Sequence, residues 1–136
     1  MANGMINGID HVGIAVRSLE ERIPFYREVL GMKEVVIEEV PDQKVRVAMF
    51  PTPHGRIELL EPTSPESPIA IFLEKNGEGI HHLALGTDDV AVGLAAVLGA
   101  GLRTIDQTPR DGADGAKIGF VHPKSTGGVL LEFCSR

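Results

Sequence analysis

The amino-acid sequence predicts an α+β fold built from two tandem β-α-β-β-β modules. A repeated strand is the first indication: residues 9–16 read IDHVGIAV and residues 80–87 read IHHLALGT, and an offset of 71 residues places His11 on His82. A helix-start signal follows each copy of this strand, and three strand-like segments follow each helix. At 136 residues the chain is long enough for one hydrophobic core. We therefore expect a single domain over residues 1–136.

The first module is expected over about residues 6–62. Ser18 and Glu21 form an S-x-x-E capping box, which predicts the start of a helix. Pro24 would remove a backbone hydrogen bond inside this helix, so we expect a kink there or a helix whose regular part starts later. Gly31 stands where a left-handed residue would end it. Strand-like runs then follow near residues 32–39, 44–51 and 55–61.

A linker helix is expected between the modules, over about residues 67–76, because Ser67 is a good N-cap and a proline follows it. The second module, about residues 79–136, then repeats the plan. Its helix is expected from about Asp89 to Leu98. Its later strands are expected near residues 102–107, 116–122 and 128–134.

Composition and charge exclude several classes of partner. The net charge is −6 and no run of lysine or arginine appears, which argues against a nucleic-acid partner. No apolar run approaches the ~20 residues that span a bilayer, so no membrane partner is expected. Cys134 is the single cysteine, which fits a reducing compartment. With no signal-peptide pattern at the start, the sequence predicts a cytoplasmic protein.

Each repeated histidine is followed by a short apolar strand that carries a carboxylate. RIELLEP holds Glu58, 47 residues after His11, and VLLEFCS holds Glu132, 50 residues after His82. Two imidazoles and two carboxylates form a mixed ligand set that suits an octahedral divalent cation better than a structural zinc site, which would favour cysteine. Four protein ligands would leave two positions for a chelating substrate.

Strand alternation favours His82 over its neighbour His81 as the second imidazole. Neighbouring residues of a strand point to opposite faces, and the repeat places His81, with Asp10, on the face opposite the candidate ligands. The faces that carry His11 and His82 otherwise hold glycine and alanine, which leaves room for a metal ion. The alternative is that both histidines are core residues. Two repeat-related glutamates argue against it, because buried glutamate is rare without a partner.

Duplicated modules with one histidine and one glutamate each resemble the vicinal oxygen chelate superfamily, which includes glyoxalase I, extradiol dioxygenases, fosfomycin-resistance proteins and methylmalonyl-CoA epimerases. The epimerases are the closer resemblance. It is carried by IDHVGIAV and by two longer segments, ELLEPTSPESPIAIFLEKNGEGIHHLAL (58–85) and KIGFVHPKSTGGVLLEF (117–133). The resemblance implies a cupped mixed sheet around a metal site and a homodimer. It also implies His11, Glu58, His82 and Glu132 as metal ligands, with Co²⁺ as the metal and Zn²⁺, Ni²⁺ or Mn²⁺ as alternatives.

The activity implied by this resemblance is interconversion of the (R) and (S) epimers of methylmalonyl-CoA. The proton alpha to the thioester would be removed and returned on the opposite face, through an enolate whose charge the metal offsets. Glu132 is the implied catalytic base for one face. Some epimerases carry a second carboxylate at the position of Val47, so this chain departs from them there. Candidates for the missing acid or base are Glu38, Glu39, Asp42, Lys44 and Lys117, or a water bound by one of them.

The acyl-CoA substrate would need cations for its phosphates, and Lys117, Lys124 and Arg110 are candidates. A glyoxalase I-type lactoylglutathione lyase is the first alternative, because such enzymes often have a His/Glu/His/Glu ligand set like this one. A non-catalytic binding protein on the same scaffold is the second alternative. A dioxygenase is disfavoured, because that site needs two histidines and one glutamate around Fe²⁺, and Glu58 would crowd it.

Overall fold

The computed structural model describes residues 5–136 and divides the chain into two compact units. The first unit contains the described residues up to His11 and those from His82 to Arg136, and the second contains Val12–His81. Two strands pass from one unit into the other, so His11 and His82 are the boundary residues of the first unit. In the described part of the chain, no helix is both long and apolar enough to cross a membrane.

The first elements along the chain belong to the second unit or, like β1 and β5, are shared between the two units. They are β1 (Ile6–Ala15), α1 (Leu19–Pro24), η1 (Phe25–Val29), β2 (Val36–Val40), η2 (Pro41–Gln43), β3 (Val45–Thr52), β4 (Gly55–Pro62), α2 (Pro68–Asn76) and β5 (Gly79–Thr87). The remaining elements belong to the first unit. They are α3 (Val90–Gly99), β6 (Arg110–Asp111), η3 (Ala113–Gly115), β7 (Lys117–Val121), α4 (Pro123–Thr126) and β8 (Leu131–Ser135).

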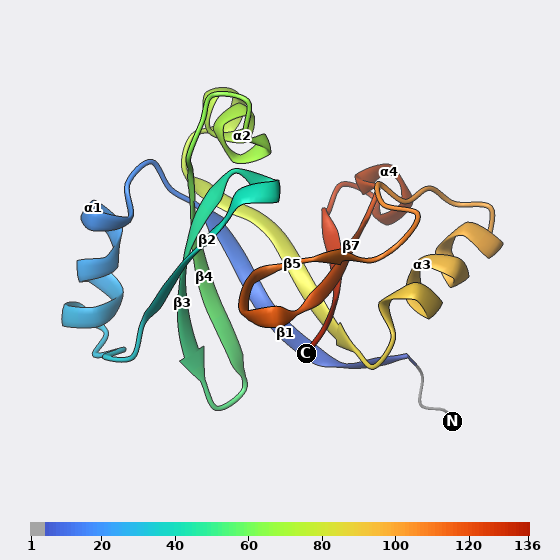
Figure 1. Cartoon of the computed structure of the whole chain (residues 1–136), viewed down its shortest axis with the longest axis horizontal. Helices are drawn as coiled ribbons and strands as arrows, with labels where there is room; N and C mark the ends of the chain where they lie inside the picture. The colour runs from blue at the N-terminus through green and yellow to red at the C-terminus, as the bar shows by residue number, and fades with distance from the viewer. Residues whose placement is uncertain (1–4) are drawn as a thin grey trace. The chain divides into compact units, whose positions relative to one another are not determined.

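In the second unit, β2, β3 and β4 form an antiparallel sheet that packs against α1. β3 and β4 are joined by a tight turn and lie side by side along their length (Figure 1). The buried side chains between sheet and helix are apolar, as the pattern of the first module predicts: Val16, Leu19, Ile23, Ala48, Phe50 and Leu59.

The first helix changes its hydrogen-bond pattern at Pro24, where the sequence predicts a kink. The Oγ of Ser18 accepts a hydrogen bond from the Glu21 amide at 3.3 Å, which caps the start of α1. Pro24 has no N–H to continue the pattern, and the chain goes on as one turn of π-helix, η1, whose end is marked by a bond from the Leu30 amide to the Phe25 carbonyl. Gly31 follows with φ of 75°, as a helix-ending glycine should.

In the first unit, β5 pairs in parallel with β8, and β8 pairs antiparallel with β7. β8 separates two apolar environments because its side chains alternate between faces. Phe133 packs with Val90 and Leu94 of α3, which lies beside this sheet (Figure 1). Cys134 packs on the opposite face with Ala84 and other small or aromatic side chains. The face opposite α3 is the one that carries Glu132.

Two features of the second module differ from the sequence predictions. The strand expected near residues 102–107 is reduced to an isolated bridge between Thr104 and Val121. The reason is that the Asp106 carboxylate accepts a hydrogen bond from the Phe120 amide at 2.8 Å and so replaces a backbone carbonyl in the ladder. The turn expected before the last strand contains one helical turn, α4, which the His122 side chain caps by accepting from the Lys124 amide.

Gly119 on β7 provides a test of the packing against α3. A Cβ at this position would lie 2.8 Å from Leu94 Cδ1 and 3.0 Å from Val90 Cγ1, both on buried side chains. We expect Gly119→Ala to lower the free energy of unfolding by about 1–3 kcal/mol through overpacking, measured by urea denaturation. Gly79→Ala is the matched strand control, because nothing lies within 4 Å of its Cβ position. Equal stability of the two variants would contradict the close packing.

Candidate metal centre

One potential ligand atom from each of His11, His82 and Glu132 lies close to the other two in the first unit. Glu132 Oε1 lies 2.9 Å from His11 Nε2 and 3.3 Å from His82 Nε2. The two Nε2 atoms are 3.1 Å apart. All three side chains are at most 6% exposed. The structure therefore gathers three of the four candidate ligands in a space from which water is largely excluded.

Sheet register explains why His82 and Glu132 face the same way. Ala84 is the partner of Glu132 across the parallel pair of β5 and β8, and His82 precedes Ala84 by two residues on the same face. Phe120 is the partner of Glu132 on β7, and its ring meets the His82 ring edge-on at 5.4 Å between centroids. The aromatic ring limits how the His82 imidazole can turn.

The electrostatics of this cluster favour an ionised carboxylate. Burial would raise the pKa of Glu132, but the close approach of the His11 and His82 imidazoles lowers it to about 2. Glu132 Oε1 is nevertheless a buried oxygen without a well-directed hydrogen bond to any described residue. A cation between Oε1 and the two Nε2 atoms would satisfy this oxygen and the lone pairs of neutral imidazoles.

The size of the triangle fits a divalent metal ion. Ligand atoms about 2.1 Å from an ion and at right angles to one another would lie about 3.0 Å apart. The three observed separations run from 2.9 to 3.3 Å. Two imidazole nitrogens and one carboxylate oxygen are a donor set that first-row divalent metals accept. These three side chains thus form a group that could hold one such ion.

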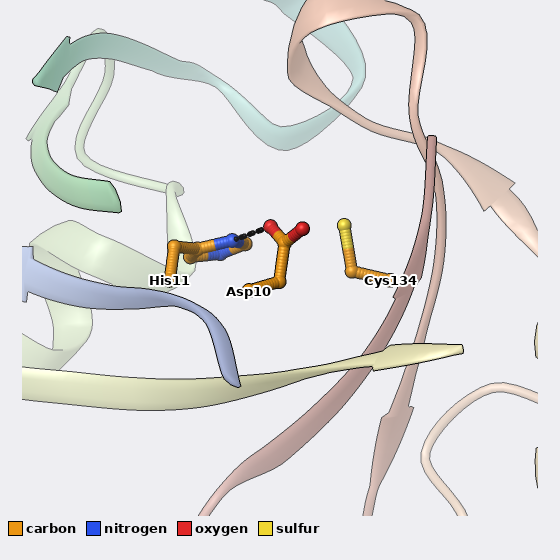
Figure 2. Close-up of side chains that lie close together, drawn as sticks. All are labelled: Asp10, His11 and Cys134. Carbon is orange, nitrogen blue, oxygen red and sulfur yellow. Dashed lines mark hydrogen bonds and ion pairs between the residues drawn. The ribbon is translucent and has the colours of Figure 1, made fainter. Parts of the chain in front are cut away.

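A further residue that strand alternation did not reveal contacts the first imidazole. The Asp10 carboxylate lies 2.7 Å from His11 Nδ1, although neighbouring strand residues start toward opposite faces (Figure 2). Burial would raise the pKa of Asp10, but hydrogen bonds with His11 and Arg136 hold it well below its usual range. The adjacent Asp-His pair in the sequence was the only signal for this contact.

The other candidate ligands lie in the second unit. Glu58 is on β4 and is 4% exposed, so it is a buried carboxylate as the sequence predicts, and its role as a ligand stays a prediction. His81 packs its ring edge-on against Phe72 of α2, with 5.1 Å between centroids. Within the first unit, the structure places His82 beside His11.

Val47 is the position at which the resemblance led us to expect a second carboxylate, and it is 3% exposed on β3. Its cross-strand partner on β2 is Glu38, so the two side chains share a face of the sheet. Glu39 is the partner of Arg46 and points to the other face. Of the other candidates, Asp42 is in η2 and Lys44 directly follows it.

The candidate cations for an anionic substrate all lie in the first unit. Arg110 Nε is 2.8 Å from Asp106 Oδ1, and its guanidinium lies 5.7 Å from the centre of the Phe120 ring. Lys117 pairs with Asp111 at 2.5 Å, and Lys124 is exposed on α4. Arg110 is thus close to an aromatic side chain that itself contacts His82.

Comparison with solved structures confirms the predicted fold class. A methylmalonyl-CoA epimerase from Streptomyces coelicolor, in complex with 2-nitronate-propionyl-CoA, has a TM-score of 0.90 and 40% sequence identity, covering 96% of this chain and 94% of that one. A methylmalonyl-CoA epimerase in complex with methylmalonyl-CoA and ammonium gives the same TM-score, identity and coverage.

Sequence comparison agrees with the structures. The ethylmalonyl-CoA/methylmalonyl-CoA epimerase of Cereibacter sphaeroides is 39% identical over 130 residues, which are 94% of this chain and 97% of that protein. The sequence profile of the glyoxalase/bleomycin resistance protein/dioxygenase superfamily matches residues 10–120. The chain belongs to the glyoxalase/bleomycin resistance protein/dioxygenase superfamily.

Proposed function

We propose that this protein is a metal-dependent epimerase that interconverts the (R) and (S) epimers of methylmalonyl-CoA. The observation that carries the proposal is the buried Glu132 carboxylate between two imidazole nitrogens. The epimerase names of the similar proteins, two of which hold acyl-CoA ligands, support the substrate class. The predicted homodimer and cytoplasmic location stay predictions.

His11, His82 and Glu132 would hold the divalent ion, and Glu58 is proposed as the fourth ligand. A bound divalent cation supplies a positive charge that stabilises negative charge developing on the thioester oxygen. Glu132 is ionised at neutral pH and accepts the alpha proton from one face. Its low pKa makes it a weak base, so the reaction needs a substrate whose acidity is raised at the site. Co²⁺ is the proposed ion, and Zn²⁺, Ni²⁺ and Mn²⁺ are alternatives.

Glu38 is the proposed acid or base for the second face of the substrate. Among the candidates, it is the carboxylate paired directly with Val47 across two strands, where side chains on one face start about 5 Å apart. A carboxylate on β2 would then take the role that the resemblance leads us to expect at Val47 on β3. Arg110, Lys117 and Lys124 are proposed to bind the phosphates of the CoA moiety.

Incorporation of deuterium tests the reaction. With Co²⁺ added, the wild-type protein should exchange the alpha proton of one methylmalonyl-CoA epimer in deuterated water, measured by mass spectrometry. Glu132→Gln should lower the rate at least ~10²-fold at saturating Co²⁺, because it removes the proton acceptor. Glu74→Gln, an exposed change on α2, is the control. No exchange above background by the wild type, together with turnover of the glutathione–methylglyoxal hemithioacetal, would support the lyase instead.

Measuring inversion of the substrate separately from proton exchange distinguishes the role of Glu38 from that of Glu132. Glu38→Gln should slow epimerisation ~10²-fold or more, while exchange from the epimer served by Glu132 persists, because one face keeps its base. Glu39→Gln is the matched control, since this neighbour points to the other face of the sheet. Chiral analysis of the product measures inversion, and NMR measures exchange. If Glu38→Gln inverted the substrate as fast as Glu39→Gln, another group would have to serve the second face.

Metal binding should increase the free energy of unfolding of the protein. A Co²⁺ concentration of about 100 times Kd should add about 2.7 kcal/mol to the free energy of unfolding, and EDTA should remove that increment. A tenfold weaker site would lose about 1.4 kcal/mol of it. We expect such a loss in Glu58→Ala but a smaller one in Glu58→Gln, whose amide oxygen can still bind metal. Equal increments in the wild type and Glu58→Ala would remove Glu58 from the ligand set.

A further inference from the structure

A partly exposed charged cluster lies behind the candidate metal centre, on the Nδ1 side of His11. Asp10 Oδ2 is 2.7 Å from His11 Nδ1, and Cys134 approaches the same two groups (Figure 2). The Arg136 guanidinium donates two hydrogen bonds to the Asp10 carboxylate, from Nη2 to Oδ2 at 2.8 Å and from Nε to Oδ1 at 3.1 Å. Asp114 Oδ2 lies 3.5 Å from the other end of the same guanidinium.

We propose that Asp10, held in place by Arg136, is a positioning residue that fixes the proton of His11 on Nδ1 and so presents the Nε2 lone pair to the metal. The inference rests on the proposed metal centre. It assigns to Asp10 a role that acts through His11 and involves no contact with the substrate.

The proton assignment follows from the chemistry of the partners. An ionised carboxylate can only accept hydrogen bonds, so the His11 nitrogen that faces Asp10 must carry the proton. A neutral imidazole has one N–H, so Nε2 is then unprotonated and can act as a lone-pair donor. Nε2 is the atom that faces Glu132 and His82. A histidine with the opposite tautomer would point a hydrogen at the space where the ion is proposed to bind.

Arg136 accounts for the fixed place of the Asp10 side chain. Without a partner, a carboxylate that is 16% exposed would turn toward water and leave Nδ1. Two guanidinium nitrogens on the two oxygens of Asp10 restrict this rotation, as paired Arg–carboxylate contacts do. Oδ2 accepts from Arg136 and still faces His11, so both contacts are made together.

The same contacts argue against a second metal ion at Asp10, His11 and Cys134. These groups lie close enough to share an ion, but the guanidinium already supplies the positive charge there. Burial also raises the pKa of the Cys134 thiol, and the protonated thiol is a poor ligand. We therefore interpret Asp10, Cys134 and Arg136 as neighbours that support His11, and not as ligands of a second ion.

The arrangement breaks the symmetry of the repeat. The position equivalent to Asp10 in the second module is His81, whose ring packs against Phe72. The His82 ring is instead bounded by the edge-on contact with Phe120. The carboxylate support at the preceding residue therefore belongs to the first histidine, and Asp10 variants should affect His11 selectively.

The test compares Asp10→Asn with Asp111→Asn, an exposed aspartate of the same unit. Calorimetric titration with Co²⁺ should show a 10–100-fold weaker Kd for Asp10→Asn and an unchanged Kd for the control. Arg136→Gln should weaken binding to a lesser degree, and Asp10→Glu should recover part of the affinity. Thermal unfolding of each metal-free variant checks that it folds.

Nitrogen-15 NMR of the metal-free protein measures the tautomer of His11 directly. His11 should appear as the Nδ1–H tautomer in the wild type, and should shift toward Nε2–H in Asp10→Asn. A wild-type His11 that carries its proton on Nε2, or an Asp10→Asn variant with wild-type Kd, would overturn the inference. Normal Co²⁺ binding without any alpha-proton exchange would instead overturn the proposed function and leave this role of Asp10 standing.

Discussion

The site depends on one physical constraint, which is that a buried carboxylate oxygen and two imidazole nitrogens lie within 3.3 Å of each other. Each of these atoms carries a lone pair, and burial removes the water that would otherwise separate them. Protons on the histidines could relieve the repulsion, but then neither imidazole could act as a ligand. A divalent cation would satisfy all three atoms at once, and the register of the neighbouring strands brings these atoms together.

The strands meet this requirement through register. β8 turns Glu132 toward the histidines and turns Phe133 toward α3, so one strand serves both the site and the core. The parallel pairing of β5 with β8 fixes His82 relative to Glu132. The glycine on β7 lets α3 approach closely from the apolar face. Tight packing on one face therefore limits movement of the ligands on the other.

The sequence carries most of the fold and part of the site. Local signals with a direct mechanism were reliable: the Ser18 cap and the change of hydrogen-bond pattern at Pro24 follow from backbone chemistry. Strand period likewise explains why His82 shares a face with Glu132, while its role as a ligand stays a prediction. The prediction of a strand near residues 102–107 was wrong because the Asp106 carboxylate, in place of a backbone carbonyl, accepts the hydrogen bond from the Phe120 amide. Strand propensity does not encode such a substitution. The contact of Asp10 with His11 was missed because alternation describes where a side chain starts and not how far it reaches.

The position of β8 has a consequence for folding fidelity. Glu132 is on this strand, and Arg136, which holds Asp10, directly follows it. A slip of one residue would turn the Glu132 carboxylate into the apolar cluster under α3, at a cost of several kcal/mol for a buried unpaired charge. A slip of two residues would move Arg136 about 7 Å along the strand and away from Asp10. The charges that prepare the site thus also discriminate against misaligned pairing of the last strand, so errors in assembly are penalised before any metal binds.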